Sequence, residues 1–341
     1  MLARILTGFV FVVLLVLCIG AFSLYNGNNG EEVAVLIPRG AGVSKVAAVL
    51  EQEGVMHNAF LFKLLVTLTG GRGGVKAGEY SFKKDQGAVG ALLTFYYSTP
   101  IEHTVTIPEG WNARQIAGIL QAQKLAEPKK FLEIVFSPKS AAKYKLSSPT
   151  LEGYLFPDTY TFSRVDGEER IVDRMVQRFF SKTESLRGEI KSSGMTTEQW
   201  VTLASIIEKE TGVPTERELI SSVFHNRLKK KMRLQSDPTT IYGISDFDGN
   251  LTKKHLQTST AYNTYTIPAL PPGAIASPGF EALRATLHPA QTEYLYFVAN
   301  NQGGHLFSAT YAEHSQKVDQ YQKRRATRNA NSERQIGNIR R

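Results

Sequence analysis

An uncharged apolar segment near the N-terminus is the strongest constraint on how this chain can fold. Residues 5–25, ILTGFVFVVLLVLCIGAFSLY, contain no charged side chain and are about as long as a helix that spans a lipid bilayer. Arg4 precedes the segment, whereas Glu31 and Glu32 follow it, so the positive-inside rule places residues 1–4 in the cytoplasm. We therefore expect 5–25 to be a single-pass transmembrane anchor, with the bulk of the chain on the extracytoplasmic side.

A cleaved secretory signal is the alternative interpretation of this segment. The apolar stretch is longer than the usual signal core, and no small-x-small cleavage site follows it, so an uncleaved anchor is the better prediction. Cys18, the only cysteine of the chain, lies inside the segment. The exported part can therefore form no disulfide, and a hydrophobic core must stabilise it.

The chain is basic. Its 341 residues carry a formal net charge of +9, which favours nucleic acid, anionic lipid or an anionic polymer as a partner. Much of the excess lies near the C-terminus, where we predict a basic, disordered tail at 324–341. The sequence contains no zinc-finger, P-loop or dinucleotide motif, and His305 and His314 do not have the spacing of a zinc site. We therefore predict no nucleic acid partner, no metal and no cofactor.

A sequence repeat organises the first third of the chain. IPRGAGVSKVAAVL (37–50) aligns without gaps on IPEGWNARQIAGIL (107–120), and each copy has the pattern of a strand, a turn and a helix. Between the copies, 76–82 alternates like a strand and 87–98 is apolar like a buried helix. After a linker at 26–32, we expect a small βααβ unit over 33–100 that resembles a LysM-like carbohydrate-binding module. A plain α/β spacer without a ligand is the alternative.

A helix over 197–211 carries two glutamates, Glu208 and Glu210. Thr196 and Gln199 form a capping-box pattern at its start, and Gly212 is expected to end it in a left-handed cap. Because a helix turns by about 100° per residue, the apolar side chains of Leu203, Ile206 and Ile207 lie within about 60° of Glu210. Glu208 lies about 160° away. Glu210 therefore occupies a position that the pattern reserves for a buried side chain.

Burial of Glu210 would have a chemical consequence. A carboxyl group that loses its hydration has a raised pKa, and the negative end of the helix dipole in the last turn acts in the same direction. A carboxyl group that stays protonated near neutral pH can serve as a general acid. The alternative is an ordinary half-buried glutamate paired with Arg217, Arg227 or Arg233.

Longer motifs around this helix resemble a known family. They are LASIIEKETGVPTERELISSVFHNRLKKKMRLQSDPTTIYG (203–243), TAYNTYTIPALPPGAIASPG (260–279), YLYFVANNQGGHLFSATYAEH (294–314) and EGYLFPDTY (152–160). Together, in this order, they closely resemble the endolytic murein transglycosylase family (MltG, or YceG-like). The resemblance covers nearly the whole chain, is weaker before residue 100 and is absent from the basic tail.

The resemblance implies a peptidoglycan lyase. Members of this family cleave the glycosidic bond between N-acetylmuramic acid and N-acetylglucosamine within glycan strands and leave 1,6-anhydromuramoyl ends. The family's catalytic glutamate matches the second glutamate of EKE, which is Glu210. One carboxyl group suffices for this reaction, since the 6-hydroxyl of the sugar replaces water as the nucleophile, whereas ordinary glycosidases use two carboxylates.

Substrate-binding residues are expected in the neighbouring motifs. Gln235, Ser236 and Asp237 could bind acetamido or hydroxyl groups, and Asp237 could stabilise positive charge at the anomeric carbon. Aromatic faces and polar groups suited to sugar rings are expected from Tyr262, Asn263, Tyr265, Glu152 and Tyr154. For each of these residues, an ordinary turn or core position is the alternative.

The predicted fold class is α+β: an N-terminal single transmembrane helix, a small LysM-like α/β module and a mixed α+β catalytic domain over 101–323. The expected location is the bacterial inner membrane, with the enzyme facing the periplasm. The resemblance further implies that the enzyme ends nascent strands beside peptidoglycan synthases (penicillin-binding proteins). Three alternatives remain: a non-catalytic peptidoglycan-binding scaffold, a lysozyme-like hydrolase, and a pyridoxal-phosphate lyase, for which no phosphate-binding loop with a partnered lysine is present.

Overall fold

The computed structural model describes residues 31–70 and 75–323 and divides the chain into two compact units. Unit 1 holds the described residues up to Val105 with Leu120–Ala126 and Tyr160–Glu168; unit 2 holds the remaining described residues. The predicted anchor 5–25 and the predicted tail 324–341 lie outside the described residues. In the part that the structure describes, no helix is both long and apolar enough to cross a membrane.

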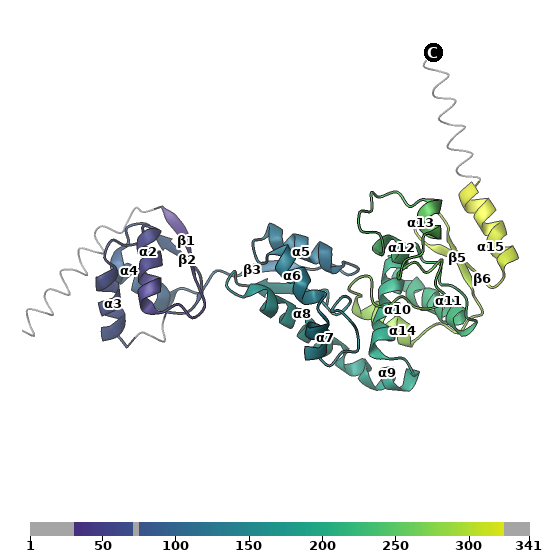
Figure 1. The fold of residues 1–341 in the computed structure, drawn as a ribbon, viewed down its shortest axis with the longest axis horizontal. Coiled ribbons are helices and arrows are strands. Elements are labelled where there is room, and N and C mark those ends of the chain that lie inside the picture. The colour runs from purple at the N-terminus through teal and green to yellow at the C-terminus, as the bar shows by residue number, and fades with distance from the viewer. Residues whose placement is uncertain (1–30, 71–74, 324–341) are drawn as a thin grey trace, which may run out of the picture. The chain divides into compact units, whose positions relative to one another are not determined.

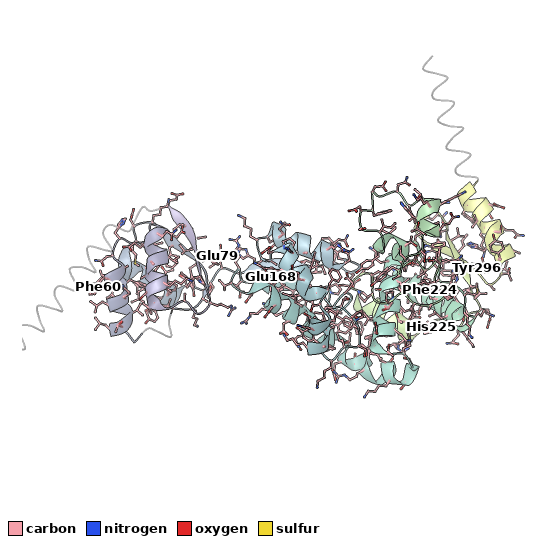
Figure 2. All side chains as sticks on the ribbon, in the orientation of Figure 1. Phe60, Glu79, Glu168, Phe224, His225 and Tyr296 are labelled. Atoms are coloured by element: carbon pink, nitrogen blue, oxygen red, sulfur yellow. The ribbon has the colours of Figure 1, made fainter. Side chains whose placement is uncertain are left out.

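Unit 1 begins with the βααβ order that the sequence predicts. The elements are β1 (Glu32–Ile37), α2 (Val43–Gln52), α3 (Ala59–Leu68) and β2 (Gly78–Lys83), followed by α4 (Gly87–Tyr97) (Figure 1). The two strands pair in antiparallel register, and every second residue of each strand points into the core, which α2, α3 and α4 complete. Phe62 and Phe95 meet inside this core, whereas Phe60 lies on the outer side of α3 (Figure 2).

The predicted repeat is present as structure. The second copy forms β3 (His103–Thr106) and α5 (Ala113–Ala122), and β3 pairs with β4 (Thr159–Phe162). Gly40 and Gly110 occupy matching turn positions with φ of +71° and +73°. Because L side chains rarely adopt this left-handed conformation, the shared glycine explains why both copies turn from strand to helix in the same way.

Helices make up most of the remaining described residues. Together with the short two-stranded sheets, they confirm the predicted mixed α+β class. The remaining helices are α6 (Pro128–Val135), α7 (Pro138–Lys143), α8 (Gly167–Thr183), α9 (Arg187–Ser193), α10 (Thr197–Glu210), α11 (Arg217–Lys229), α12 (Asp237–Tyr242), α13 (Lys253–Gln257), α14 (Phe280–Leu287) and α15 (Tyr311–Val318). An antiparallel hairpin of β5 (Tyr296–Ala299) and β6 (His305–Ser308) precedes α15, as the sequence predicts.

Helix α10 is the central element of unit 2. Eight consecutive residues, Trp200–Ile207, are buried, and α10 packs against α14, α11 and α12. The predicted capping box of Thr196 and Gln199 is confirmed. The predicted left-handed cap is wrong: the helix ends when Thr211 becomes extended at φ −142°, and Gly212 has no positive φ. Thr211 needs that geometry because its hydroxyl accepts from the Val213 amide at 2.9 Å.

Gly153 fixes the loop before β4 against α10. Its φ is +88°, and a Cβ placed there would lie 2.5 Å from the Ala274 Cβ and 2.8 Å from a Val201 methyl. Gly153→Ala is therefore expected to lower the free energy of unfolding of unit 2 by about 2–4 kcal/mol, because it adds backbone strain to overpacking. Urea unfolding followed by tryptophan fluorescence measures this, since both tryptophans, Trp111 and Trp200, lie in unit 2.

Gly118→Ala is the matched control. Gly118 is an exposed residue inside α5 and nothing lies within 4 Å of a Cβ built on it. Alanine in a helix interior is better than glycine by about 0.5–1 kcal/mol, so this variant should be at least as stable as the parent. Equal stability of the two variants would contradict the close packing of Gly153.

Candidate active site

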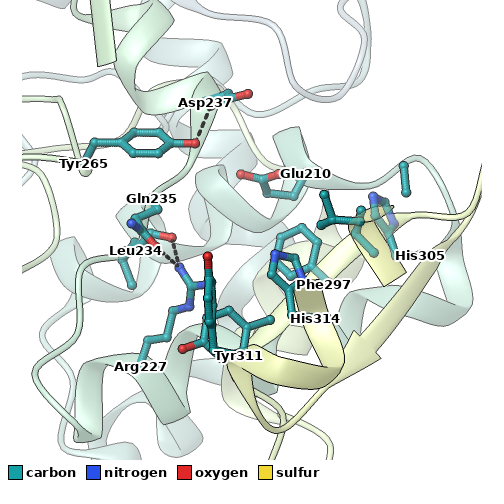
Figure 3. A pocket seen from close by; sticks show the side chains of 14 residues that line it. Glu210, Arg227, Leu234, Gln235, Asp237, Tyr265, Phe297, His305, Tyr311 and His314 are labelled. Atoms are coloured by element: carbon teal, nitrogen blue, oxygen red, sulfur yellow. Dashed lines mark hydrogen bonds between the residues drawn. The ribbon is translucent and has the colours of Figure 1, made fainter. Parts of the chain in front are cut away.

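The last residue of α10, Glu210, lines a cavity of about 420 Å³ in unit 2 (Figure 3). The walls come from α10, α11, the segment before α12, the β5–β6 hairpin and α15. The side chain of Glu210 is partly exposed, so its carboxyl group is open to the cavity although protein atoms surround it closely. The end of a helix that is buried along most of its length thus presents one carboxyl group to a solvent-accessible space.

Within the described residues, one side-chain hydrogen bond holds Glu210. The Ser236 hydroxyl donates to its Oε1 at 2.5 Å. Burial raises the pKa of Glu210 to about 7, against the lowering effect of this hydrogen bond, and the nearby Asp237 carboxylate raises it further. The group is therefore partly protonated at neutral pH, which suits an acid that must also accept a proton.

The segment that carries Ser236 is tightly constrained. Gln235 has a φ of +53°, which is uncommon for a residue with a side chain, and its amide donates to the Thr264 carbonyl at 3.2 Å. The amide of Ser236 donates to the Thr264 hydroxyl at 2.9 Å. Strained backbone of this kind persists only where surrounding contacts impose it, and here it directs Ser236 towards Glu210.

Asp237 is a second carboxylate in the same cavity. It is the first residue of α12, and the Tyr265 hydroxyl donates to its Oδ1 at 2.6 Å (Figure 3). Tyr265 also lines the cavity, and burial followed by the Asp237 hydrogen bond raises its phenol pKa. Four residues that the sequence predicts to bind substrate, Gln235, Ser236, Asp237 and Tyr265, are therefore gathered around Glu210.

Arg227 supplies a buried positive charge to the cavity. Its side chain comes from α11 and donates to the carbonyls of Leu295 at 2.6 Å and Leu234 at 2.7 Å. Its guanidinium also lies 5.3 Å from the centre of the Tyr296 ring. No salt bridge joins Arg227 to Glu210 in the described part of the chain, so its charge acts on the carboxyl from a distance.

Glu208 has a different environment from Glu210. Its carboxylate accepts from the Gly279 amide at 3.1 Å and lies 3.6 Å from the Arg217 guanidinium. The Glu208 side chain is only 7% exposed. The side of α10 that the helical pattern does not assign to the core is therefore buried as well. Arg217 pairs with this glutamate and not with Glu210. Glu208 thus binds α10 to the loop before α14 and does not line the cavity.

The hairpin and α15 form an aromatic side of the cavity. Tyr296 stacks on His314 with ring centres 5.1 Å apart, and Tyr311 meets Tyr296 edge to face at 5.9 Å. His305 is fixed by Glu216, whose carboxylate lies 2.7 Å from its Nδ1 and also accepts from its backbone amide. Aromatic rings beside a carboxyl group are suited to pyranose rings, which present apolar faces.

Four other predicted site residues do not line this cavity. Asn263 is fully buried, and its side-chain amide donates to three backbone carbonyls at the end of α13, so it holds the last turn of that helix. Tyr154 is 2% exposed and packs on Phe179. Tyr262 packs against Tyr242 with ring centres 4.8 Å apart. The structure places these three residues outside the cavity lining, and their contact with substrate stays a prediction.

Glu152, the fourth, is a buried carboxyl group inside unit 2. It accepts from the Ala113 amide at 3.0 Å and from the Tyr242 hydroxyl at 2.9 Å. Burial raises its pKa to about 7, although both hydrogen bonds lower it. Because Tyr242 is the last residue of α12, Glu152 holds the far end of the helix that begins with Asp237.

Sequence reasoning missed the residues that complete the cavity. Sequence patterns indicate Arg227 only as a salt-bridge partner, and they indicate no substrate-binding role for Tyr296, Tyr311 and His314. The alternating aromatic residues of 294–297 were the available signal, but their strand could not be placed beside α10 from local pattern alone. Within residues 31–70 and 75–323, the structure contains no cluster of potential metal ligands.

Known proteins match this chain over most of its length. A sequence profile of the YceG-like family matches residues 35–320. An endolytic murein transglycosylase of Bacillus subtilis (strain 168) is 32% identical over 311 residues, which cover 86% of each chain. An endolytic murein transglycosylase of Streptococcus pneumoniae serotype 2 is 28% identical over 87% of this chain, which spans 59% of that longer protein.

A solved structure has the same fold. The crystal structure of a yceG-like protein from Listeria monocytogenes is 33% identical and superposes with a TM-score of 0.59, covering 84% of this chain and 98% of its own. Because sequence profile, relatives and fold agree over this extent, the chain belongs to the YceG-like family.

Proposed function

We propose that this protein is an endolytic peptidoglycan lytic transglycosylase with Glu210 as its catalytic acid and base. It cleaves the bond between N-acetylmuramic acid and N-acetylglucosamine within glycan strands and leaves a 1,6-anhydromuramoyl end. The observation that carries the proposal is the cavity: a carboxyl group with a pKa of about 7 lies in a space lined by aromatic and polar side chains. Its relatives in B. subtilis and S. pneumoniae are named endolytic murein transglycosylases.

The chemistry needs one carboxyl group that works twice. Protonated Glu210 first donates its proton to the oxygen of the leaving sugar as the glycosidic bond breaks. The resulting carboxylate then takes the proton of the 6-hydroxyl, while that oxygen bonds to the anomeric carbon and closes the anhydro ring. A pKa near neutral pH makes both proton transfers accessible, and Ser236 keeps the carboxyl oriented between them.

The rest of the cavity positions the strand. Asp237, fixed by Tyr265, stabilises positive charge at the anomeric carbon, and Gln235 binds hydroxyl or acetamido groups. Tyr311, whose side chain is largely exposed, offers its ring to the sugars, and Arg227 supplies a positive field for the carboxylates of the peptide substituents. No cofactor takes part.

A lysozyme-like hydrolase is a second candidate, and one observation favours it. Asp237 gives the cavity a second carboxylate, and two carboxylates are what a water-using glycosidase requires. The products distinguish the two, since hydrolysis leaves reducing ends. A non-catalytic scaffold is a third candidate, but it has no need of a desolvated carboxyl group at the end of a buried helix.

The location follows from the substrate and the sequence. The segment 5–25 anchors the enzyme in the inner membrane, so that it acts in the periplasm where new strands emerge. The βααβ part of unit 1 is a LysM-like module that holds glycan, and peptidoglycan synthases are the protein partners. Crosslinking in cells that recovers no synthase would count against the partnership.

Glu210→Gln is expected to lower kcat/KM on purified peptidoglycan by about 10²–10⁴, because the amide can neither donate the catalytic proton nor take it back. Mass spectrometry of the released fragments measures the anhydromuramoyl ends. In the parent enzyme, activity should fall as the pH rises through about 7, where Glu210 loses its proton.

Glu208→Gln is the matched control on the same helix. It removes one charge of a buried pair with Arg217, but the glutamine oxygen can still accept from the Gly279 amide and Glu208 does not line the cavity. Its products should therefore remain anhydromuramoyl ends, at a rate within about tenfold of the parent. Full activity in Glu210→Gln would remove this residue from the mechanism, and reducing ends in the parent would establish the hydrolase.

Ser236→Ala should move the alkaline limit of activity to higher pH. The hydroxyl stabilises the carboxylate form of Glu210, so its loss raises the pKa of that carboxyl and keeps it protonated in more alkaline solution. We expect kcat/KM near neutral pH to fall by about tenfold, since the carboxyl also loses its orientation. A pH–rate profile measures both effects; a lower or unchanged alkaline limit would contradict the role of Ser236.

A further inference from the structure

Unit 1 exposes an apolar surface that its own core does not use. We define the α3–α4 patch as Phe60, Leu64 and Leu68 on α3 together with Leu93, Tyr96 and Tyr97 on α4. Three of these are largely in solvent: Phe60 is 71% exposed, Leu68 70% and Tyr97 85%. Large exposed apolar side chains that lie together mark interaction surfaces.

The patch is continuous between the two helices. On α3, Phe60, Leu64 and Leu68 follow one another at four-residue intervals and so form one stripe. The Tyr96 hydroxyl of α4 donates to the Thr69 hydroxyl at 3.3 Å, directly beyond Leu68, so the second group of side chains meets the end of the stripe. Phe60 lies on the outer side of α3 (Figure 2).

The composition of the two helices matches a lipid surface. The sequences AFLFKLLVTL of α3 and GAVGALLTFYY of α4 contain no acidic residue, and Lys63 is their only charge. Water-facing helices normally carry charges of both signs. Leucine and phenylalanine next to tyrosine and lysine are the side chains that partition into the boundary between headgroups and acyl chains, with the lysine reaching towards the phosphates.

The sequence before unit 1 indicates that a lipid bilayer lies close enough to cover the α3–α4 patch. Six residues, 26–31, separate the apolar segment 5–25 from β1, which begins at Glu32. Six residues span at most about 20 Å, whereas a unit of this size is about 25–30 Å across. If 5–25 crosses the bilayer, as its sequence predicts, unit 1 cannot move away from the bilayer surface by more than its own width.

We propose that the α3–α4 patch docks on the lipid bilayer, so that unit 1 lies against the membrane with these side chains at the headgroup boundary. The inference rests on the membrane insertion of 5–25 and is independent of the chemistry at Glu210. Docking fixes the orientation of unit 1 at the surface, which the length of residues 26–31 alone does not determine.

The opposite face of the β1–β2 sheet provides an internal comparison. Leu36 is 42% exposed and lies between Val35 and Ile37, both of which point into the core. Because strand residues alternate between faces, Leu36 faces away from α3 and α4. It is an exposed apolar residue of the same unit that the proposed docking leaves in water.

The test places a fluorescent probe on each face. Full-length Phe60→Trp and Leu36→Trp proteins are reconstituted into phosphatidylcholine–phosphatidylglycerol vesicles with or without bromine on the acyl chains, and the emission of the parent protein is subtracted. We expect bromine to quench the Phe60→Trp probe at least about twofold and to leave the Leu36→Trp probe within about 10%. Matching thermal unfolding of both variants to the parent establishes that the fold is intact.

A second variant tests whether the patch acts as one surface. In a Tyr97→Trp protein, quenching should be lost when Phe60 and Leu68 are both changed to aspartate, since two carboxylates cannot enter the boundary. No quenching at Phe60→Trp, or equal quenching at Leu36→Trp, would overturn the proposal. Three other results would also overturn the proposal: crosslinking of the patch to a second copy of the chain, protection of the patch by bound glycan fragments, and failure of the protein to float with vesicles. The last result would mean that 5–25 is not a membrane anchor.

Discussion

Burial around the whole circumference of α10 is the constraint on which the site depends. With Trp200–Ile207 enclosed on every side, the helix cannot turn or slide without exposing apolar surface, so the position of its last residue is fixed. Arg227, Ser236 and the hairpin reach the cavity from elements that pack on this helix or on its neighbours. Glu210 therefore needs little support of its own, and one hydrogen bond from Ser236 suffices to orient it.

Local pattern predicted those parts of the fold and site that depend on local physics. The capping box located the start of α10, and the aligned glycines of the repeat marked two equivalent turns. Helical periodicity favoured Glu210 over Glu208 as the buried carboxyl group, but the structure buries Glu208 as well, and the catalytic role of Glu210 stays a prediction. The rest depends on residues far apart in the sequence. His305 binds Glu216 from 89 positions away, and Glu152 meets Tyr242 from 90, so no window of sequence contains these pairs.

Two buried carboxyl groups show why a perturbed pKa alone does not identify a catalytic residue. Burial raises the pKa of both Glu152 and Glu210 to about 7. Glu152 is 2% exposed and its oxygens are occupied by Ala113 and Tyr242, so it links α5 to α12. Glu210 has one partner and opens to a cavity. Access to substrate separates the two roles, and only the folded structure provides it.

The same two groups couple stability to pH. In each, the folded-state pKa lies above the ordinary value of 4.5, so the folded chain binds more protons than the unfolded chain between about pH 4.5 and 7. Their effect on folding is neutral below that range and unfavourable above it, so the free energy of unfolding falls as the pH rises from about 4.5 to about 7 and stays lower above that pH. No disulfide offsets this cost, since the only cysteine, Cys18, has no partner in the chain, and the buried core around α10 must do so. Desolvation of Glu210 thus favours its protonated, acid-competent form, and the same carboxyl group lowers the stability of the fold only at pH values where that proton is lost.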